Sequence, residues 1–243
     1  MLSPEGTTRG RYYLPGELSK NVVREARGER TLVDRVQAAG EIVGKALQEV
    51  RAAAASGVST LELDAVAEQT IRDAGAYPTF KGYEGFSGSI CASVNDVIVH
   101  GIPDKETILA EGDLVSIDCG ATLDGWVGDS AWSFAVGELD ADVAALNTAT
   151  EYVLMEGMQA MVPGNLLTDV SYALEQATRR AEEKFGVELF IVDGYGGHGI
   201  GRTMHEEPYL ANEGRPGRGP LIQEGSVLAI EPMLTLGTED SAV

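Results

Sequence analysis

The sequence has 243 residues, which is long enough for one large domain with a substantial hydrophobic core. Its formal net charge of −20 argues against a nucleic-acid partner held through phosphates, because such binding requires clustered Lys and Arg. Cys91 and Cys119 form no CxxC pair, which argues against a disulfide framework or a thiolate zinc site. With no apolar run long enough for a membrane span and no signal-peptide pattern, we expect a cytoplasmic protein.

The first part of the chain predicts an extension followed by helices. Residues 1–32 are rich in Gly, Pro and charge, and we interpret them as an N-terminal extension ahead of the main domain at 33–243. Apolar residues at helical spacing predict a helix over Val33–Val50. Ser59 and Glu62 have the spacing of a capping box, which predicts that a second helix begins there; Gly75 would end it.

A strand-rich region comes next, and its clearest element is a β-hairpin. Leu114–Asp118 has the composition of a strand, Asp124-Gly125 is a strong turn signal, and Trp126–Phe134 would return antiparallel. Two further helices are predicted after it, over about 142–161 and from about Thr168 to Gly186.

The hairpin would bring two carboxylates together. If Asp124 and Gly125 are the two central turn residues, Asp118 lies opposite Ala131 and shares a face with Asp129, about 7–8 Å away. Neighbouring apolar residues suggest that both faces are buried, namely Val115, Ile117, Val127 and Trp132. Buried carboxylates usually pair or bind a metal, although a solvated face would be an alternative explanation.

The chain also contains an internal repeat. Glu111–Asp118 resembles Glu224–Glu231 at an offset of 113 residues, and His100–Pro103 resembles His205–Pro208 at an offset of 105. With a predicted helix pair before each segment, this favours a duplicated α+β unit with pseudo-twofold symmetry and a site between its halves. Glu231 would then occupy the position that Asp118 has in the first half.

The sequence has three histidines, His100, His198 and His205, and each lies in a Gly- or Pro-rich segment. One neutral imidazole together with several carboxylates suits Mn, Fe, Co or Zn. The same set does not suit structural zinc, which prefers thiolates or more histidines. A single histidine would more often be an ordinary core or surface residue, so the argument depends on all three.

Together these segments resemble the type I methionine aminopeptidase family from about residue 33 to the end. The matching segments are Cys91–Asp96, His100–Pro103, Ile117-Asp118, Asp124-Gly125, Gly128-Asp129, Gly197–Gly201, His205–Pro208 and Ile230–Met233. The resemblance implies the α+β pita-bread fold, in which a duplicated helix-helix-strand unit with pseudo-twofold symmetry surrounds a central antiparallel sheet.

The resemblance also implies roles for individual residues. The metal-ligand positions are Asp118, Asp129, His198 and Glu231, and they would hold two divalent cations, Co, Mn, Fe or Zn. His100 and His205 fall on positions that contact substrate and the tetrahedral intermediate, and Glu231 would also take or relay a proton. The positions near the methionine side chain are Tyr83, Phe86, Cys91 and Met204.

The implied activity is removal of the initiator methionine when the next residue is small. Expected partners are N-terminal peptides of nascent proteins, which a monomeric enzyme could meet at the ribosome, with no membrane or nucleic acid involved. An Xaa-Pro aminopeptidase or dipeptidase of the same fold, or a non-catalytic pita-bread binding protein, are the alternatives. By the repeat, the twelve residues Pro232–Val243 would begin a connection, and a further strand carrying a carboxylate is expected beyond them.

Overall fold

The computed structural model describes residues 31–241, which fall into two compact units. Among the described residues, the N-terminal unit is built from Asp34–Asp140 with Gly201–Met204, and the C-terminal unit from 141–200, 205–241 and the short segment 31–33. The predicted extension, residues 1–32, lies almost wholly outside the described range and stays a prediction. Within that range, no helix combines the length and apolar character needed to cross a membrane.

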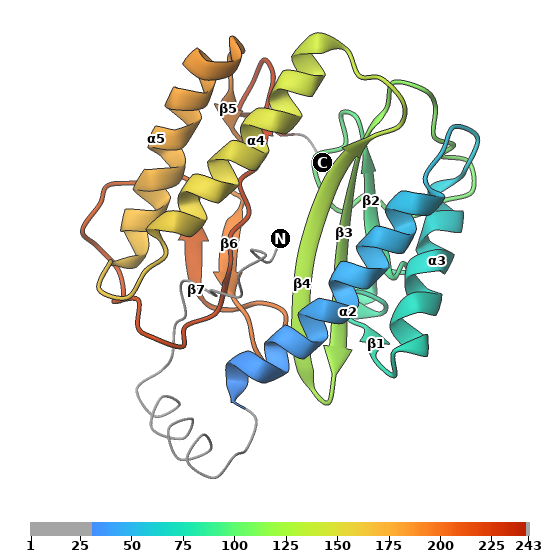
Figure 1. Ribbon diagram of the computed structural model, residues 1–243, viewed down its shortest axis with the longest axis horizontal. Coiled ribbons are helices and arrows are strands. Elements are labelled where there is room, and N and C mark those ends of the chain that lie inside the picture. The colour runs from blue at the N-terminus through green and yellow to red at the C-terminus, as the bar shows by residue number, and fades with distance from the viewer. Residues whose placement is uncertain (1–30, 242–243) are drawn as a thin grey trace. The chain divides into compact units, whose positions relative to one another are not determined.

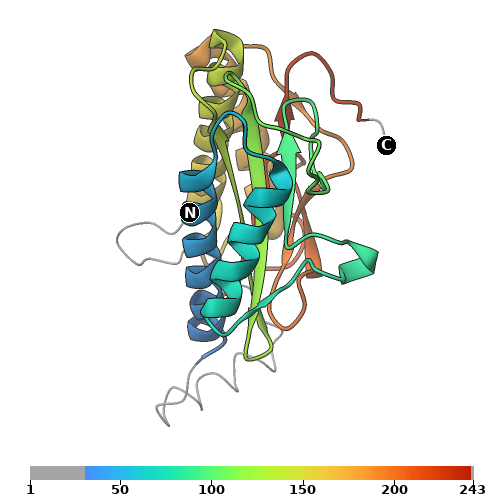
Figure 2. The same ribbon diagram turned by 90° about the vertical axis from the view of Figure 1, so that its right-hand side faces the viewer.

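The N-terminal unit places two helices on one face of an antiparallel sheet (Figures 1 and 2). Strand β4 pairs along the whole of β3, whereas β2 and β1 pair with successive parts of the other edge of β3. The elements are α2 (Leu32–Ala53), α3 (Thr60–Asp73), β1 (Tyr77–Pro78), the 3-10 turn η1 (Tyr83–Gly85), β2 (Ile90–Val94), β3 (Leu114–Leu123) and β4 (Trp126–Ala135).

Local signals set the ends of α3 as predicted. The Ser59 side-chain oxygen accepts a hydrogen bond from the Glu62 N–H at 3.2 Å, and the Ser59 N–H donates to the Glu62 carboxylate at 2.8 Å. This reciprocal pair satisfies two of the N–H groups that a helix start leaves unpaired. At the other end Gly75 has a φ of +76°, the left-handed conformation that ends many helices.

The predicted hairpin and its register are confirmed. Asp124 and Gly125 both have positive φ, 52° and 74°, as a two-residue type I′ turn requires. Asp118 pairs with Ala131, and Asp129 pairs with Gly120 two positions along β3. Both carboxylates therefore start from the same face of the sheet.

The expectation that both faces of the hairpin are buried was wrong. One face lies under α2 and α3, and its β3 residues Val115, Ile117, Cys119 and Ala121 are fully buried. The other face carries Asp118 and is half-buried and polar, with a 2.7 Å hydrogen bond between the hydroxyls of Ser116 and Ser133. The reason is the register. Trp132 lies opposite Ile117, so Val115, Ile117 and Trp132 all share the helix-covered face.

Helix α2 approaches β4 backbone to backbone at Gly128. A Cβ added at Gly128 would lie 2.4 Å from the Gly40 backbone nitrogen, whereas a Cβ added at Gly40 would meet no atom within 4 Å. We therefore expect Gly128→Ala to lower the free energy of unfolding by about 1–3 kcal/mol through overpacking. Gly40→Ala is expected to raise it by about 0.5–1 kcal/mol, because Ala favours a helix interior.

Urea unfolding of the two variants measures both effects. Because both substitutions add the same single methyl group at one helix–strand contact, opposite signs identify the Gly128 backbone as the point of approach. Equal changes in both variants would contradict this account of how α2 packs.

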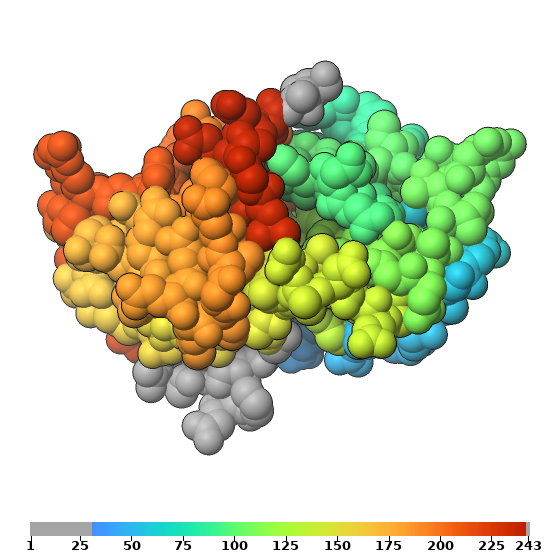
Figure 3. Space-filling model, turned by 90° about the horizontal axis from the view of Figure 1, so that it is seen from above, coloured from blue at the N-terminus to red at the C-terminus, as the bar shows by residue number. Residues whose placement is uncertain are grey.

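The C-terminal unit repeats the plan of two helices and antiparallel strands. Strands β7, β6 and β8 form one sheet in that order, and β5 pairs with β9. Because of that pairing, the end of the described chain, red in Figure 3, lies against the orange segment that contains β5. The elements are α4 (Ala141–Ala160), α5 (Leu167–Phe185), β5 (Phe190–Ile191), β6 (Gly196–Gly199), β7 (Glu206–Ala211), β8 (Leu228–Ala229) and β9 (Leu234–Thr235).

The internal repeat appears in the strand pairing of each unit. Moving β2 by the offset of 105 residues and β3 by the offset of 113 reproduces the pairing of β6 with β8. Thus β2–β3 pairs Ser93 with Ser116 and Val94 with Val115, and β6–β8 pairs His198 with Ala229 and Gly199 with Leu228. This agreement in register confirms that the chain contains a duplicated α+β unit.

Candidate metal centre

Strand β6 presents His198 between two glycines. A Cβ added at Gly197 would lie 2.1 Å from the Ala229 carbonyl oxygen, and one at Gly199 would lie 2.3 Å from the Glu207 carbonyl oxygen. Only glycine therefore permits the neighbouring backbones to come this close on both sides of the histidine. The resulting packing buries His198, which is 8% exposed.

Hydrogen bonding assigns the tautomer of His198. Its Nδ1 lies 2.8 Å from the Gly199 carbonyl oxygen, which can only accept, so Nδ1 carries the proton and donates. In the neutral ring Nε2 then holds a lone pair. Histidines that bind metals commonly have this arrangement, with the second ring nitrogen donating to a backbone carbonyl.

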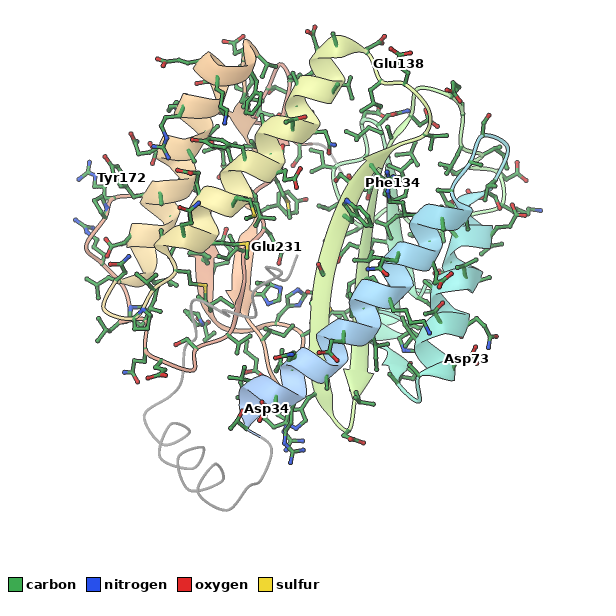
Figure 4. All side chains as sticks on the ribbon, in the orientation of Figure 1. Asp34, Asp73, Phe134, Glu138, Tyr172 and Glu231 are labelled. Atoms are coloured by element: carbon green, nitrogen blue, oxygen red, sulfur yellow. The ribbon has the colours of Figure 1, made fainter. Side chains whose placement is uncertain are left out.

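The Nε2 lone pair faces a carboxylate. Glu231 lies beside β6 (Figure 4), and its Oε1 is 2.9 Å from His198 Nε2. Oε1 is buried and has no hydrogen-bond partner among residues 31–241. A protonated ring would form an ion pair with Glu231, whereas with the neutral ring two acceptor atoms this close repel unless a cation lies beside both. The chemistry of this pair fits a divalent cation.

Asp118 and Asp129, the two predicted aspartate ligands, belong to the sheet of the N-terminal unit. Asp118 lies in a row across the sheet, between Cys91 on β2 and Ala131 on β4. Asp129 lies in the next row, opposite Gly120. Ionised carboxylates only accept hydrogen bonds and repel one another, so a pair on one sheet face is a suitable binding surface for cations.

Phe80 lies near the predicted pocket residues but was not among those chosen from the sequence. A Cβ added at Gly120 would lie 2.7 Å from the Phe80 ring, so this aromatic side chain covers the sheet beside Asp129. Phe80 is 5% exposed, whereas Tyr83 is 39% exposed. Phe86 is half-buried. The signal in the sequence was a cluster of three aromatic residues within seven positions, Phe80, Tyr83 and Phe86. Only Tyr83 and Phe86 were predicted to line the pocket.

Cys91 and Met204, the other two predicted pocket residues, are both buried parts of the N-terminal unit. Burial raises the pKa of the Cys91 thiol well above its ordinary value, and the nearby Asp118 and Asp129 carboxylates raise it further. The thiol therefore stays protonated and behaves as a small polarisable wall rather than as a thiolate ligand. The assignment of the four residues to a methionine pocket stays a prediction.

The other two histidines differ from His198 in being exposed. His100 has a φ of +58°, a conformation that is costly for a residue other than glycine and is often found at functional sites. Gly101 fixes the segment against β2, because its carbonyl accepts from the Ala92 N–H at 2.8 Å. The His205 ring packs edge-on against His198, with 4.5 Å between ring centroids. Exposure leaves both imidazoles accessible to a substrate.

The sequence profile of the metallopeptidase family M24 matches residues 34–242. The chain belongs to this family. Membership agrees with the lone-pair contact at His198 and Glu231, because a metallopeptidase needs oxygen and nitrogen ligands that hold a catalytic cation. The fold is the α+β pita-bread fold that the resemblance implied.

Two relatives support this membership, and one more distant structure shares the fold. Methionine aminopeptidase 1 of Mycobacterium tuberculosis is 54% identical over 242 residues, covering 100% of this chain and 87% of the relative. The crystal structure of methionine aminopeptidase from Thermotoga maritima superposes with a TM-score of 0.81 at 34% identity, covering 96% of this chain and 85% of that one. X-Pro aminopeptidase from Thermotoga maritima, at 22% identity, TM-score 0.64 and 87% and 56% coverage, shares the fold.

Proposed function

We propose that this chain removes the N-terminal methionine from newly made proteins by metal-dependent hydrolysis. Within the M24 family, the structural observation that supports metal-dependent hydrolysis is the contact between His198 Nε2 and Glu231 Oε1. These two atoms lie 2.9 Å apart. The relatives named methionine aminopeptidase, similar over most of the chain, support methionine as the residue removed. The chain is therefore an aminopeptidase and a hydrolase.

The ligands that we propose for two divalent cations are Asp118, Asp129, His198 and Glu231. Three carboxylates and one imidazole form a hard to borderline donor set, which suits Co, Mn, Fe or Zn. When bound, such cations polarise a carbonyl and lower the pKa of water, which makes hydrolysis possible near neutral pH.

The remaining chemistry belongs to protein side chains. We propose that Glu231 also accepts or relays the proton of the attacking water, because a carboxylate can act as a general base. The exposed His205 ring can donate an N–H to the oxyanion that develops on the scissile carbonyl. His100, held in its left-handed conformation, would orient the residue that follows methionine.

We propose that the methionine side chain enters a pocket formed by Tyr83, Phe86, Cys91 and Met204. Aromatic and sulfur-containing side chains are polarisable and suit a thioether. Met204 is flexible, so the pocket is expected to be slightly roomier than one closed by an aromatic residue. We further propose that a monomeric, cytoplasmic form acts on nascent chains at the ribosome.

Substrate choice tests the proposed function directly. We expect Met-Ala-Ser to be cleaved faster than Met-Leu-Ser and Leu-Ala-Ser. A poorly fitting hydrophobic group costs about 1–3 kcal/mol in the transition state, a difference of roughly 10–200-fold in kcat/KM. Release of the first amino acid in the presence of Co²⁺ or Mn²⁺ measures this.

An Ala-Pro-Ala peptide provides the comparison with the Xaa-Pro enzymes of this fold. Equal rates on the three non-proline peptides would contradict a methionine pocket, and preference for Ala-Pro-Ala would identify an Xaa-Pro peptidase instead. Absence of hydrolysis together with absence of metal binding would indicate a non-catalytic binding protein.

A further inference from the structure

Asn212 follows directly after β7 and contacts the backbone of Glu231. Its side chain is 3% exposed, and its Nδ2 donates to the Glu231 carbonyl oxygen at 2.7 Å. Glu231 lies between β8 and β9, outside both strands, and the next residue is Pro232, which has no N–H. The Glu231 carbonyl oxygen therefore accepts its hydrogen bond from a side chain, whereas a carbonyl within a sheet would accept one from a neighbouring strand.

The orientation of the Asn212 amide follows from this contact. A carbonyl can only accept, so the amide must present Nδ2 to Glu231 and direct Oδ1 elsewhere. Oδ1 is buried and has no hydrogen-bond partner among residues 31–241. A buried polar atom without a hydrogen-bond partner lowers the free energy of unfolding. An apolar side chain of similar size would avoid that cost. Packing alone therefore does not explain asparagine at this position.

We propose that Asn212 is a positioning residue for the metal ligand Glu231, an inference that rests on the proposed function. Fixing the Glu231 carbonyl fixes the peptide plane that joins it to Pro232, and this limits the direction in which the Glu231 side chain leaves the backbone. The carboxylate is thereby held with Oε1 2.9 Å from His198 Nε2 before any cation arrives. Groups that orient ligands in this way typically change metal affinity by roughly 10–100-fold when they are removed.

Two substitutions separate the hydrogen bond from the shape of the side chain. Asn212→Leu keeps a similar volume and removes both polar atoms, and Asn212→Asp keeps the shape but presents an acceptor to the Glu231 carbonyl. In the metal-free full-length protein, titration with Co²⁺ followed by visible absorption should give a Kd that is roughly 10–100-fold higher for both variants.

Asn165 provides the matched control. Its Nδ2 donates to the Ala160 carbonyl oxygen at 2.8 Å, in the connection between α4 and α5, and its side chain is half-buried. Asn165→Leu removes the same kind of bond away from Glu231 and should keep the wild-type Kd for Co²⁺. Thermal unfolding of the metal-free proteins shows how much each substitution changes stability by itself.

The outcomes distinguish the inference from the proposed function. If the wild type and Asn165→Leu bind Co²⁺ and both Asn212 variants bind it with the wild-type Kd, the positioning role is wrong. A lower melting temperature with an unchanged Kd would likewise reduce Asn212 to a structural residue. If the wild type and the control bind no Co²⁺, the proposed metal site fails, and the inference fails with it.

Discussion

Asp118→Asn is expected to remove bound metal and activity together. The substitution keeps the size of the side chain but replaces an anionic oxygen with an amide, so the sheet face loses one of its two negative charges. Metal polarisation contributes several kcal/mol to the transition state, and about 1.4 kcal/mol corresponds to a factor of ten. We therefore expect kcat/KM for Met-Ala-Ser to fall by at least roughly 10²-fold, with metal content measured on the same sample.

Asp124→Asn is the control for this experiment, because it makes the same chemical change in the same hairpin. Asp124 is exposed at the turn with a φ of +52°, and asparagine adopts that conformation readily. This variant should keep its metal and its activity. Full metal occupancy in Asp118→Asn would show that Asp118 is not a ligand.

His205→Ala is expected to leave metal binding intact and to reduce turnover. The ring is exposed and packs edge-on against His198, whose own Nδ1 is already engaged with the Gly199 carbonyl. Loss of one hydrogen-bond donor to a developing oxyanion lowers kcat by roughly 10²–10³-fold. Steady-state kinetics combined with Co²⁺ titration separates the two effects, since KM and Kd should change little.

His198→Ala provides the opposite pattern. This histidine is buried with Nε2 facing Glu231, so its removal should lower the affinity for Co²⁺ and the activity together. Metal loss in His205→Ala comparable to that in His198→Ala would place His205 among the ligands and refute its role at the oxyanion.

Several features of this protein could be predicted because they depend on neighbours in the sequence. The hairpin register follows from the Asp124-Gly125 turn, and the start of α3 follows from Ser59 and Glu62. The sequence also showed the internal repeat, and the pairing of β6 with β8 agrees with its two offsets. The family resemblance rested on the same local motifs.

Other features depend on contacts between segments far apart in the chain. The sequence alternation could not show that the Asp118 face is half-buried, because burial depends on where α2 and α3 pack. Phe80 over Gly120 and Asn212 against Glu231 join residues that no local pattern relates.

The sequence by itself predicted the side chains that we propose for the chemistry, namely the carboxylates of the hairpin and the repeat and the three histidines, because motif order and turn chemistry are local. Tertiary structure alone decided which histidine is buried, which ring nitrogen of His198 keeps its proton, and that the other faces Glu231 Oε1. The physical reason is that the burial and the tautomer of a histidine ring depend on which backbone and side-chain groups surround it after folding.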